Sequence, residues 1–197
     1  MSSDASTTRE RILQSTWSAL LDGSTPRVRM SDIANSAGIS RQALYLHFAN
    51  RTELLIATTH YIDRVKDVNR RLARSRSVSS GLERLEAYVE AWGNYIPEIY
   101  GVANALIVMG ASENEARLAW NGRLAAVREG CEAVVAALSR EGRLSDRLSP
   151  PEAIFRIHIA TPPTSSRSRY LKKSGLQSFS VSLPNMLFIH IYAVHIV

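Results

Sequence analysis

The stretch SDIANSAGISRQALYLHF, from Ser31 to Phe48, decides how the first third of this 197-residue chain folds. Two short segments with apolar residues at helical spacing lie on either side of Ala37-Gly38. Ser31 is a suitable N-cap for the first segment, Gly38 suits the left-handed backbone that ends a helix, and Ser40 can cap the second segment. The pattern predicts two short helices joined by a tight turn.

Small residues at the turn allow two such helices to cross steeply. Ala34 and Gly38 provide the room, and Ile33, Ile39 and Leu44 are the expected shared core. This packing leaves the N-terminal half of the second helix exposed. In a helix-turn-helix, that half enters the major groove of DNA.

The exposed half carries side chains that suit base and phosphate contacts. Arg41 can form a bidentate contact to guanine, and Gln42 can form one to adenine. Tyr45 and His47 can reach phosphates or a thymine methyl group, and Arg51 is a candidate phosphate contact. The N-terminal N–H groups of the helices that Ser31 and Ser40 cap also favour phosphate. The alternative is a solvated polar face on a helical hairpin, and spacing alone leaves both open.

The charge distribution favours a polyanionic partner. The net charge is +6 and the sequence pI is about 9.8. Residues 1–80 hold 12 Lys or Arg against 7 Asp or Glu, residues 81–150 hold 7 against 10, and residues 151–197 hold 5 against 1. The basic excess therefore lies at the two ends of the chain, around an acidic middle.

Several features predict a soluble cytoplasmic protein. Cys131 is the single cysteine, so no internal disulfide can form. The N-terminal residues are polar and do not resemble a signal peptide. The longest apolar stretch, MLFIHIYAVHIV, is about half the length that spans a bilayer.

The first 150 residues have helical periodicity. A helix is expected from Thr8 to the turn residues 22–26, and another periodic segment runs from Thr52 to Leu72. The polar stretch 74–81 suggests a domain boundary, with domains at residues 1–75 and 76–197. Pro97 and residues 110–114 are expected to separate three further helices, Leu82–Tyr95, Glu98–Met109 and Glu113–Arg140.

The tail does not continue this pattern. Only residues 154–159 keep any periodicity after residue 153, and residues 161–175 are rich in Ser, Pro and basic side chains. The final apolar segment has the composition of strands rather than helices. Our hypothesis is that the tail is atypical from about residue 155, irregular over residues 160–197, and the product of a frameshift near residues 153–160. A divergent functional arm is the alternative.

The segment MSDIANSAGISRQALYLHFANRTELL resembles the N-terminal domain of the TetR family of bacterial repressors, with the motif at about residues 29–48. The resemblance covers roughly residues 8–65, including the preceding helix RERILQSTWSALLDG. The family has a helix ending in Ala-Gly, a Ser-led recognition helix ending in Tyr-x-x-Phe, and a Lys/Arg-x-Glu-Leu-Leu start of the next helix. Arg51 stands where the family usually has lysine, and either cation serves a phosphate contact with different geometry.

The resemblance implies an all-α homodimer with an N-terminal helix-turn-helix domain and a C-terminal helical domain for ligand binding and dimerisation. Two such N-terminal domains would read a palindromic operator, and a small-molecule effector would release it. The DNA-facing set that it implies is Ser31, Ser40, Arg41, Gln42, Tyr45, His47 and Arg51. The atypical tail puts dimerisation in question.

A pocket for an apolar or aromatic effector is expected in the C-terminal domain. The candidate lining residues are Trp92, Tyr95, Tyr100, Met109 and Trp120, and for each of them the alternative is an ordinary core position. Cys131 lies in an apolar stripe and is expected to be buried, with a redox sensor as the alternative.

No enzyme, cofactor or metal site is expected. The histidines are scattered, and Glu83, Glu86 and Glu90 are expected to form a solvated helix face. The sequence therefore predicts a ligand-responsive transcriptional repressor. The alternative is a small-molecule-binding helical protein whose DNA-binding domain is vestigial.

Overall fold

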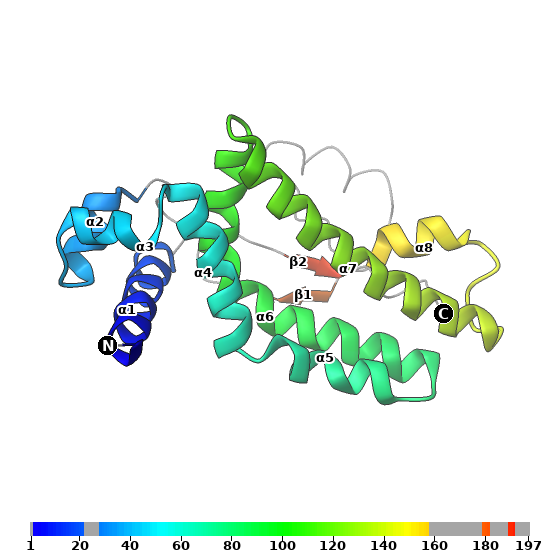
Figure 1. Ribbon diagram of the computed structural model, residues 1–197. Coiled ribbons are helices and arrows are strands. Elements are labelled where there is room, and N and C mark those ends of the chain that lie inside the picture. The colour runs from blue at the N-terminus through cyan, green and yellow to red at the C-terminus, as the bar shows by residue number, and fades with distance from the viewer. Residues whose placement is uncertain (1, 22–27, 158–178, 182–188, 192–197) are drawn as a thin grey trace. The chain divides into compact units, whose positions relative to one another are not determined.

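The computed structural model describes residues 2–21, 28–157, 179–181 and 189–191. In these ranges the chain forms eight helices and two short strands (Figure 1). The expected all-α fold is therefore confirmed for the described residues up to residue 157. The elements are α1 (Ser2–Leu20), α2 (Met30–Ser36), α3 (Arg41–His47), α4 (Arg51–Val65), α5 (Val68–Ser77), α6 (Gly81–Gly110), α7 (Asn114–Arg140), α8 (Pro150–Ile157), β1 (Phe179–Val181) and β2 (Ile189–Ile191).

The helices belong to two compact units. The first comprises Met1–Asn69 and Tyr95–Leu124, and the second comprises Arg70–Asn94 and Ala125–Val197. The long helices α6 and α7 are thus each divided between the two units. The domains predicted at residues 1–75 and 76–197 stay a prediction, because compactness does not establish which segments fold independently.

An apolar core holds the N-terminal helices together in the first unit. Its members come from α1, α2, α3 and α4, as well as from the turns that join the last three. Because each of these helices presents one apolar face to the others, the core fixes the orientation of the short helices α2 and α3. The buried members are Ile12, Leu13, Met30, Ile33, Ala34, Ala37, Leu44, Phe48 and Leu54.

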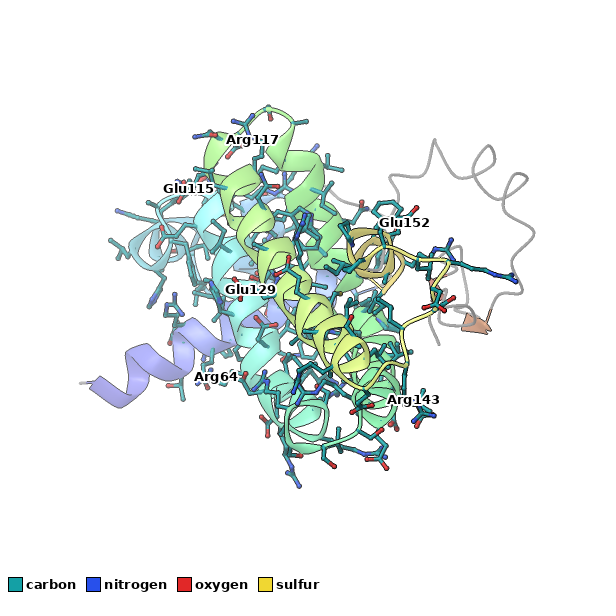
Figure 2. All side chains as sticks on the ribbon, turned by 90° about the vertical axis from the view of Figure 1, so that its right-hand side faces the viewer. Arg64, Glu115, Arg117, Glu129, Arg143 and Glu152 are labelled. Atoms are coloured by element: carbon teal, nitrogen blue, oxygen red, sulfur yellow. The ribbon has the colours of Figure 1, made fainter. Side chains whose placement is uncertain are left out.

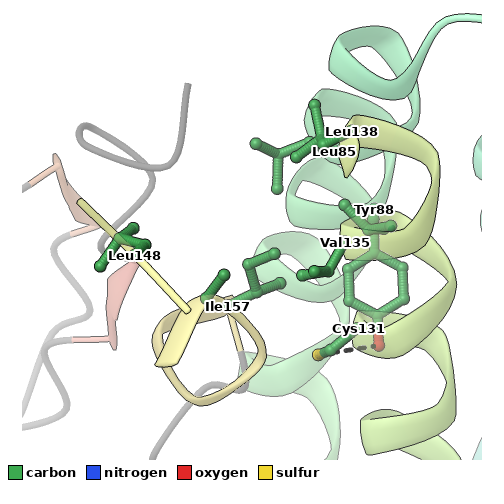
Figure 3. Packing of buried hydrophobic residues seen from close by; sticks show 9 residues of the cluster. Leu85, Tyr88, Cys131, Val135, Leu138, Leu148 and Ile157 are labelled. Carbon is green, nitrogen blue, oxygen red and sulfur yellow. Dashed lines mark hydrogen bonds between the residues drawn. The ribbon is translucent and has the colours of Figure 1, made fainter. Parts of the chain in front are cut away.

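A second apolar core joins α6, α7 and α8 in the second unit. Figure 3 shows Leu85 and Tyr88 of α6 beside the side chains of α7, with Ile157 of α8 nearby. The Tyr88 hydroxyl donates to the carbonyl of Val127 at 2.7 Å. A Cβ atom on Gly130 would lie 2.6 Å from the Tyr88 ring, so α7 needs glycine there for the two helices to pack.

Cys131 is fully buried in this second core, as expected. Its thiol lies 3.8 Å from the Tyr88 hydroxyl (Figure 3). Burial raises the pKa of the Cys131 thiol to about 11. The thiol is therefore protonated at neutral pH, which is the state of a packing residue rather than of a reactive nucleophile.

The expected N-cap of α2 is wrong. The helix begins at Met30 and its N-cap is Arg29, whose side chain makes no capping hydrogen bond. The Ser31 hydroxyl instead bonds the carboxylate of Asp32 at 3.3 Å. Met30 is 9% exposed within the N-terminal core, so its burial explains why the helix starts one residue before the serine.

The periodic segment from Thr52 to Leu72 is not one helix. It is interrupted at Lys66 and Asp67, where Asp67 has a φ of 48°. A left-handed residue ends a helix whatever the periodicity of the side chains around it. The helical structure also continues further into the polar stretch 74–81 than expected, since α5 ends at Ser77.

Pro97 does not separate two helices. It lies inside the 30-residue helix α6, so the prediction of two helices on either side of it is wrong. Proline removes one backbone hydrogen bond from a helix interior. Tyr95 and Ile99, which flank it, are 1% and 5% exposed, and burial of such side chains offsets the missing bond.

The C-terminal segment has two short described pieces. Strands β1 and β2 pair in antiparallel fashion, with Ser180 opposite His190. Upstream, α8 begins at Pro150, and the Glu152 carboxylate accepts hydrogen bonds from both the backbone N–H and the hydroxyl of Ser149. The expected irregular tail at residues 160–197 otherwise lies outside the described residues, so the frameshift hypothesis stays a hypothesis.

Several charged side chains of α7 are exposed to solvent. Glu115, Arg117 and Glu129 are three of them, and Figure 2 shows them along the length of this helix. On α6, Glu83, Glu86 and Glu90 are exposed, as expected of a solvated face. In the described ranges, none of the helices has the length and apolar character needed to cross a membrane.

Candidate DNA-binding surface

The turn between α2 and α3 is fixed by a complete C-terminal helix cap. Gly38 has a φ of 66°, a conformation that side chains with a Cβ atom rarely adopt. The N–H of Ile39 donates to the carbonyl of Ala34 at 3.0 Å, and the N–H of Gly38 donates to that of Asn35 at 3.1 Å. This pair of bonds is the Schellman motif. The expected left-handed Gly38 is confirmed.

The start of α3 is fixed by a side-chain cap. The Ser40 hydroxyl accepts a hydrogen bond from the N–H of Ala43 at 3.0 Å. Ser40 is thus the N-cap, as expected. Local hydrogen bonds define both the preceding turn and this cap. Together they fix the direction of α3 relative to α2.

The start of α4 completes the framework. The Asn50 side chain accepts from the N–H of Glu53 at 2.8 Å, and the Glu53 carboxylate accepts from the N–H of Ala49 at 2.7 Å. The arrangement is similar to a capping box, except that Glu53 accepts from the residue before the N-cap Asn50 rather than from Asn50 itself. These bonds fix the junction between α3 and α4, where Arg51 is the first residue of α4.

Two apolar residues turn one face of α3 inward. Leu44 is fully buried and Phe48, the C-cap, is 1% exposed. Their spacing of four residues places both on the same side of the chain. The guanidinium of Arg9 on α1 lies 4.7 Å from the centroid of the Phe48 ring. The opposite face of α3 is therefore left to solvent.

That outer face brings together three of the expected DNA-facing side chains. Arg41, Gln42 and Tyr45 are all exposed, and the Arg41 guanidinium lies 5.6 Å from the centroid of the Tyr45 ring. Ser40, also exposed, lies at the start of the same helix. These residues form a continuous surface with hydrogen-bond donors and acceptors.

The other expected residues are placed differently. His47 lies in the last turn of α3 and is half-buried. Ser31, on α2, is also half-buried. Arg51 is half-buried at the start of α4 and already takes part in an interaction within the chain. None of the three belongs to the fully exposed face of α3.

Leu46 was missed by reasoning from the sequence. It is 85% exposed, which is unusual for leucine. Two residues after the buried Leu44, it lies about 200° around the helix and so points outward. That spacing was readable from the sequence, although an apolar residue does not suggest solvent exposure. An exposed leucine on this face is suited to contact a thymine methyl group.

The expected effector residues have varied surroundings. Tyr95 and Met109 are buried in the first unit, where the Thr52 hydroxyl lies 2.9 Å from the Met109 sulfur. Tyr100 and Trp120 are half-buried in the same unit. Trp92 belongs to the second unit and makes an edge-on contact with Tyr88, 6.2 Å between ring centroids. An effector site formed by these residues stays a prediction.

Comparison with known proteins gives this surface a context. Residues 12–58 match the family model of the bacterial regulatory proteins of the tetR family. Over 82 residues the chain is 32% identical to the HTH-type transcriptional regulator ArpR of Pseudomonas putida, a span of 42% of this chain. The match covers only 38% of the length of ArpR.

Solved structures share the fold over a longer part of the chain. A protein from Rhodococcus sp. assigned to the TetR-family transcriptional regulators is 26% identical, with a TM-score of 0.60 over 76% of this chain and 81% of that protein. A transcriptional regulator from Saccharomonospora viridis, in complex with choline, has a TM-score of 0.64 at 20% identity. That likeness covers 77% of this chain and 80% of the regulator, and it concerns the fold alone.

Proposed function

We propose that this chain is a transcriptional repressor of the TetR type, because residues 12–58 match the family model of the bacterial regulatory proteins of the tetR family and the TetR-family regulator from Rhodococcus sp. shares its fold. It binds a palindromic operator as a homodimer in the bacterial cytoplasm, and a small-molecule effector releases it. The observation that carries this proposal is the exposed face of α3, held by hydrogen-bonded caps before and after the helix.

The side chains of α3 have the chemistry for direct readout. Arg41 presents a guanidinium that matches the two acceptors of guanine, and Gln42 presents an amide that matches adenine. Tyr45 and Leu46 add an aromatic ring and an apolar side chain on the same exposed face. We assign base contacts to these four residues.

Phosphate contacts are assigned to residues outside that face. Ser31, Ser40, His47 and Arg51 lie at or near the ends of α2, α3 and α4. Hydroxyl, imidazole and guanidinium groups all bind phosphate oxygens, and such contacts set the register of a protein on the duplex without reading its sequence. They also make the affinity depend on salt.

A homodimer explains how a seven-residue helix can give specificity. One α3 reads only a few base pairs, and two copies related by a two-fold axis read two half-sites. These lie about 34 Å apart, or one helical turn, or a multiple of it. The operator is therefore expected to be palindromic.

The effector acts by favouring one of two conformers. A ligand shifts such an equilibrium only by its difference in affinity for the two states. The Saccharomonospora viridis regulator is in complex with choline, so a protein of this fold accommodates a small molecule. We assign the effector to the C-terminal helical domain, with Trp92, Tyr95, Tyr100, Met109 and Trp120 as the candidate contacts.

Fluorescence anisotropy tests this proposal. The full chain is titrated onto labelled DNA from upstream of its own gene, with unlabelled random DNA as competitor, at two salt concentrations. We expect tight binding that the competitor does not displace, because base contacts add to the phosphate contacts. Equal binding to both DNAs that salt abolishes would contradict the proposal and favour a ligand-binding protein with a vestigial DNA-binding domain.

A further inference from the structure

Three polar side chains from three different helices meet inside the first unit. Asp63 lies on α4, Tyr95 on α6 and Arg123 on α7. The two terminal nitrogens of the Arg123 guanidinium donate to the two Asp63 oxygens at 2.6 and 2.8 Å. The Tyr95 hydroxyl donates to the same carboxylate. We name these three residues the Asp63 cluster.

The Asp63 cluster is mostly shielded from water. The side chains of Arg123 and Asp63 are 21% and 28% exposed, and Tyr95 is 1% exposed. Burial alone raises the pKa of Asp63, but the hydrogen bonds and charge of Arg123, with Tyr95 and His60, offset it and hold this pKa below its usual range. Asp63 and Arg123 are both charged at neutral pH.

Such a cluster favours one geometry more than it adds stability. Removing two charges from water costs much of what their attraction returns, so an apolar contact of the same size would stabilise the fold as well. A forked, bidentate pair instead fixes the relative direction of both side chains. The Asp63 cluster therefore restricts how α4 lies against α6 and α7 within this unit.

A second polar contact lies near the other end of α4. The hydroxyl of Thr52, the second residue of the helix, bonds the Glu113 carboxylate just before α7 and lies 2.9 Å from the Met109 sulfur on α6. Thr52 and Asp63 are separated by about 16 Å along the helix axis. Helix α4 is thus held near both ends by groups from the α6–α7 segment.

Helix α4 is in turn joined rigidly to α3. The capping bonds of Asn50 and Glu53 fix the junction, and Leu54 of α4 packs in the same core as Leu44 of α3. A rotation of α4 would therefore carry α3 with it. The direction of the exposed face of α3 depends on the contacts that hold α4.

We propose that Asp63, Tyr95 and Arg123 are positioning residues for DNA recognition, which set operator affinity by fixing α4 and, through it, α3. This inference rests on the proposed function, because it assumes that α3 reads the operator. The three residues do not touch DNA. They act by keeping α3 in the orientation that binds.

The test compares two arginines of α7. Arg123→Lys keeps the charge of the Asp63 cluster but loses the forked pair. Arg128→Lys makes the same change in an exposed pair with Glu132, four residues away on the same helix, where the distance is 2.9 Å. We expect Arg123→Lys and Tyr95→Phe to weaken operator binding about 3- to 30-fold, and Arg128→Lys to leave it unchanged.

Amide hydrogen exchange on the full chain without DNA gives a second measurement. Faster exchange confined to α3 and α4, residues 41–65, in Arg123→Lys and Tyr95→Phe, with a thermal midpoint close to that of the wild type, would support positioning. Exchange that rises evenly along the chain would overturn it in favour of a purely structural role. Unchanged operator affinity in both variants, with the wild type binding selectively, would also overturn it.

The two proposals can fail separately. If wild-type protein does not select the operator over random DNA, the proposed function fails, whatever the variants do. The exchange measurement then still decides whether the Asp63 cluster orders α3. If the wild type selects the operator and both variants bind it with wild-type affinity, the proposed function stands and the positioning role is rejected.

Discussion

The outer face of α3 and the Asp63 cluster use arginine in opposite ways. On α3 the Arg41 guanidinium is exposed and lies over the Tyr45 ring, so its N–H donors remain accessible to another molecule. In the Asp63 cluster the Arg123 guanidinium is mostly buried, and its terminal nitrogens donate to Asp63. The first arrangement suits a binding surface, and the second suits the orientation of helices.

The comparison separates two ways in which a substitution can weaken DNA binding. A change on the outer face of α3 should remove a contact and leave folding intact. A change behind α3 should alter the framework that presents the face. Substitutions on opposite sides of α3 and near its ends test this division.

The largest effect is expected from the buried side of α3. Leu44→Ala removes a fully buried side chain from the N-terminal core and should destabilise the protein by about 2–5 kcal/mol. Leu46→Ala is the matched control, since the same change at an 85% exposed position should cost less than about 0.5 kcal/mol. Urea denaturation measures both. Equal losses would show that the two faces of α3 are assigned wrongly.

The next effect concerns the exposed side. Arg41→Ala should weaken operator binding by about 1–3 kcal/mol and relax the preference for one base pair, as expected for a bidentate contact to guanine. The free energy of unfolding should stay near that of the wild type. Anisotropy titrations with operators substituted at single positions measure the lost preference. Uniform weakening on all of them would instead assign Arg41 to phosphate.

Arg51→Ala provides the contrast to Arg41. A phosphate contact carries no sequence information, so binding to operator and to random DNA should weaken alike. The slope of log affinity against log salt concentration should flatten by about one unit. Titrations on both DNAs at four salt concentrations measure this slope. A change of base preference without a change of slope would contradict the assignment.

Much of the helix-turn-helix could be predicted from the sequence because its determinants are local. Gly38 and Ser40 act on backbone groups within a few residues, and both predictions are confirmed. The same rules were wrong at Ser31 and Pro97, where burial of neighbouring side chains decides the helix bounds. A local signal identifies a cap only where packing does not oppose it.

The Asp63 cluster could not be predicted from the sequence for a related reason. Asp63 is 32 residues from Tyr95 and 60 residues from Arg123 along the chain. No spacing or motif joins three such residues, and each alone reads as an ordinary helix position. Only the packing of three helices brings them together, and the predicted helix break at Pro97 would have separated Tyr95 from the second half of α6.

A smaller loss is expected from the cap of α3. Ser40→Ala removes the side chain that accepts from the N–H of Ala43 and should lower the free energy of unfolding by about 1 kcal/mol. Ser36→Ala, at the exposed last position of α2, is the control and should change little. Urea denaturation of both variants measures the difference. If Ser36→Ala lowered the free energy of unfolding as much as Ser40→Ala, the loss at Ser40 could not be assigned to its capping hydrogen bond.

The smallest expected effect is a pH dependence that belongs to the Asp63 cluster. The pKa of Asp63 is lowered in the folded chain, since Arg123, Tyr95 and His60 outweigh the opposing effect of burial. A carboxyl group with a lowered pKa in the folded state binds fewer protons there than in the unfolded state. It therefore stabilises the fold above its unfolded pKa of about 3.9, and this contribution is lost as the pH falls toward the lower, folded value.

Asp63→Asn cannot show this titration. At neutral pH the variant should be less stable than the wild type, because Arg123 keeps its charge without the carboxylate. As the pH falls below about 4, the two stability curves should converge, since the wild type loses its own ion pair by protonation. Urea denaturation of both proteins between pH 3 and 7 measures the difference. Curves that stay parallel over this range would mean that Asp63 titrates normally and that the exposed fraction of its pair with Arg123 is screened by water.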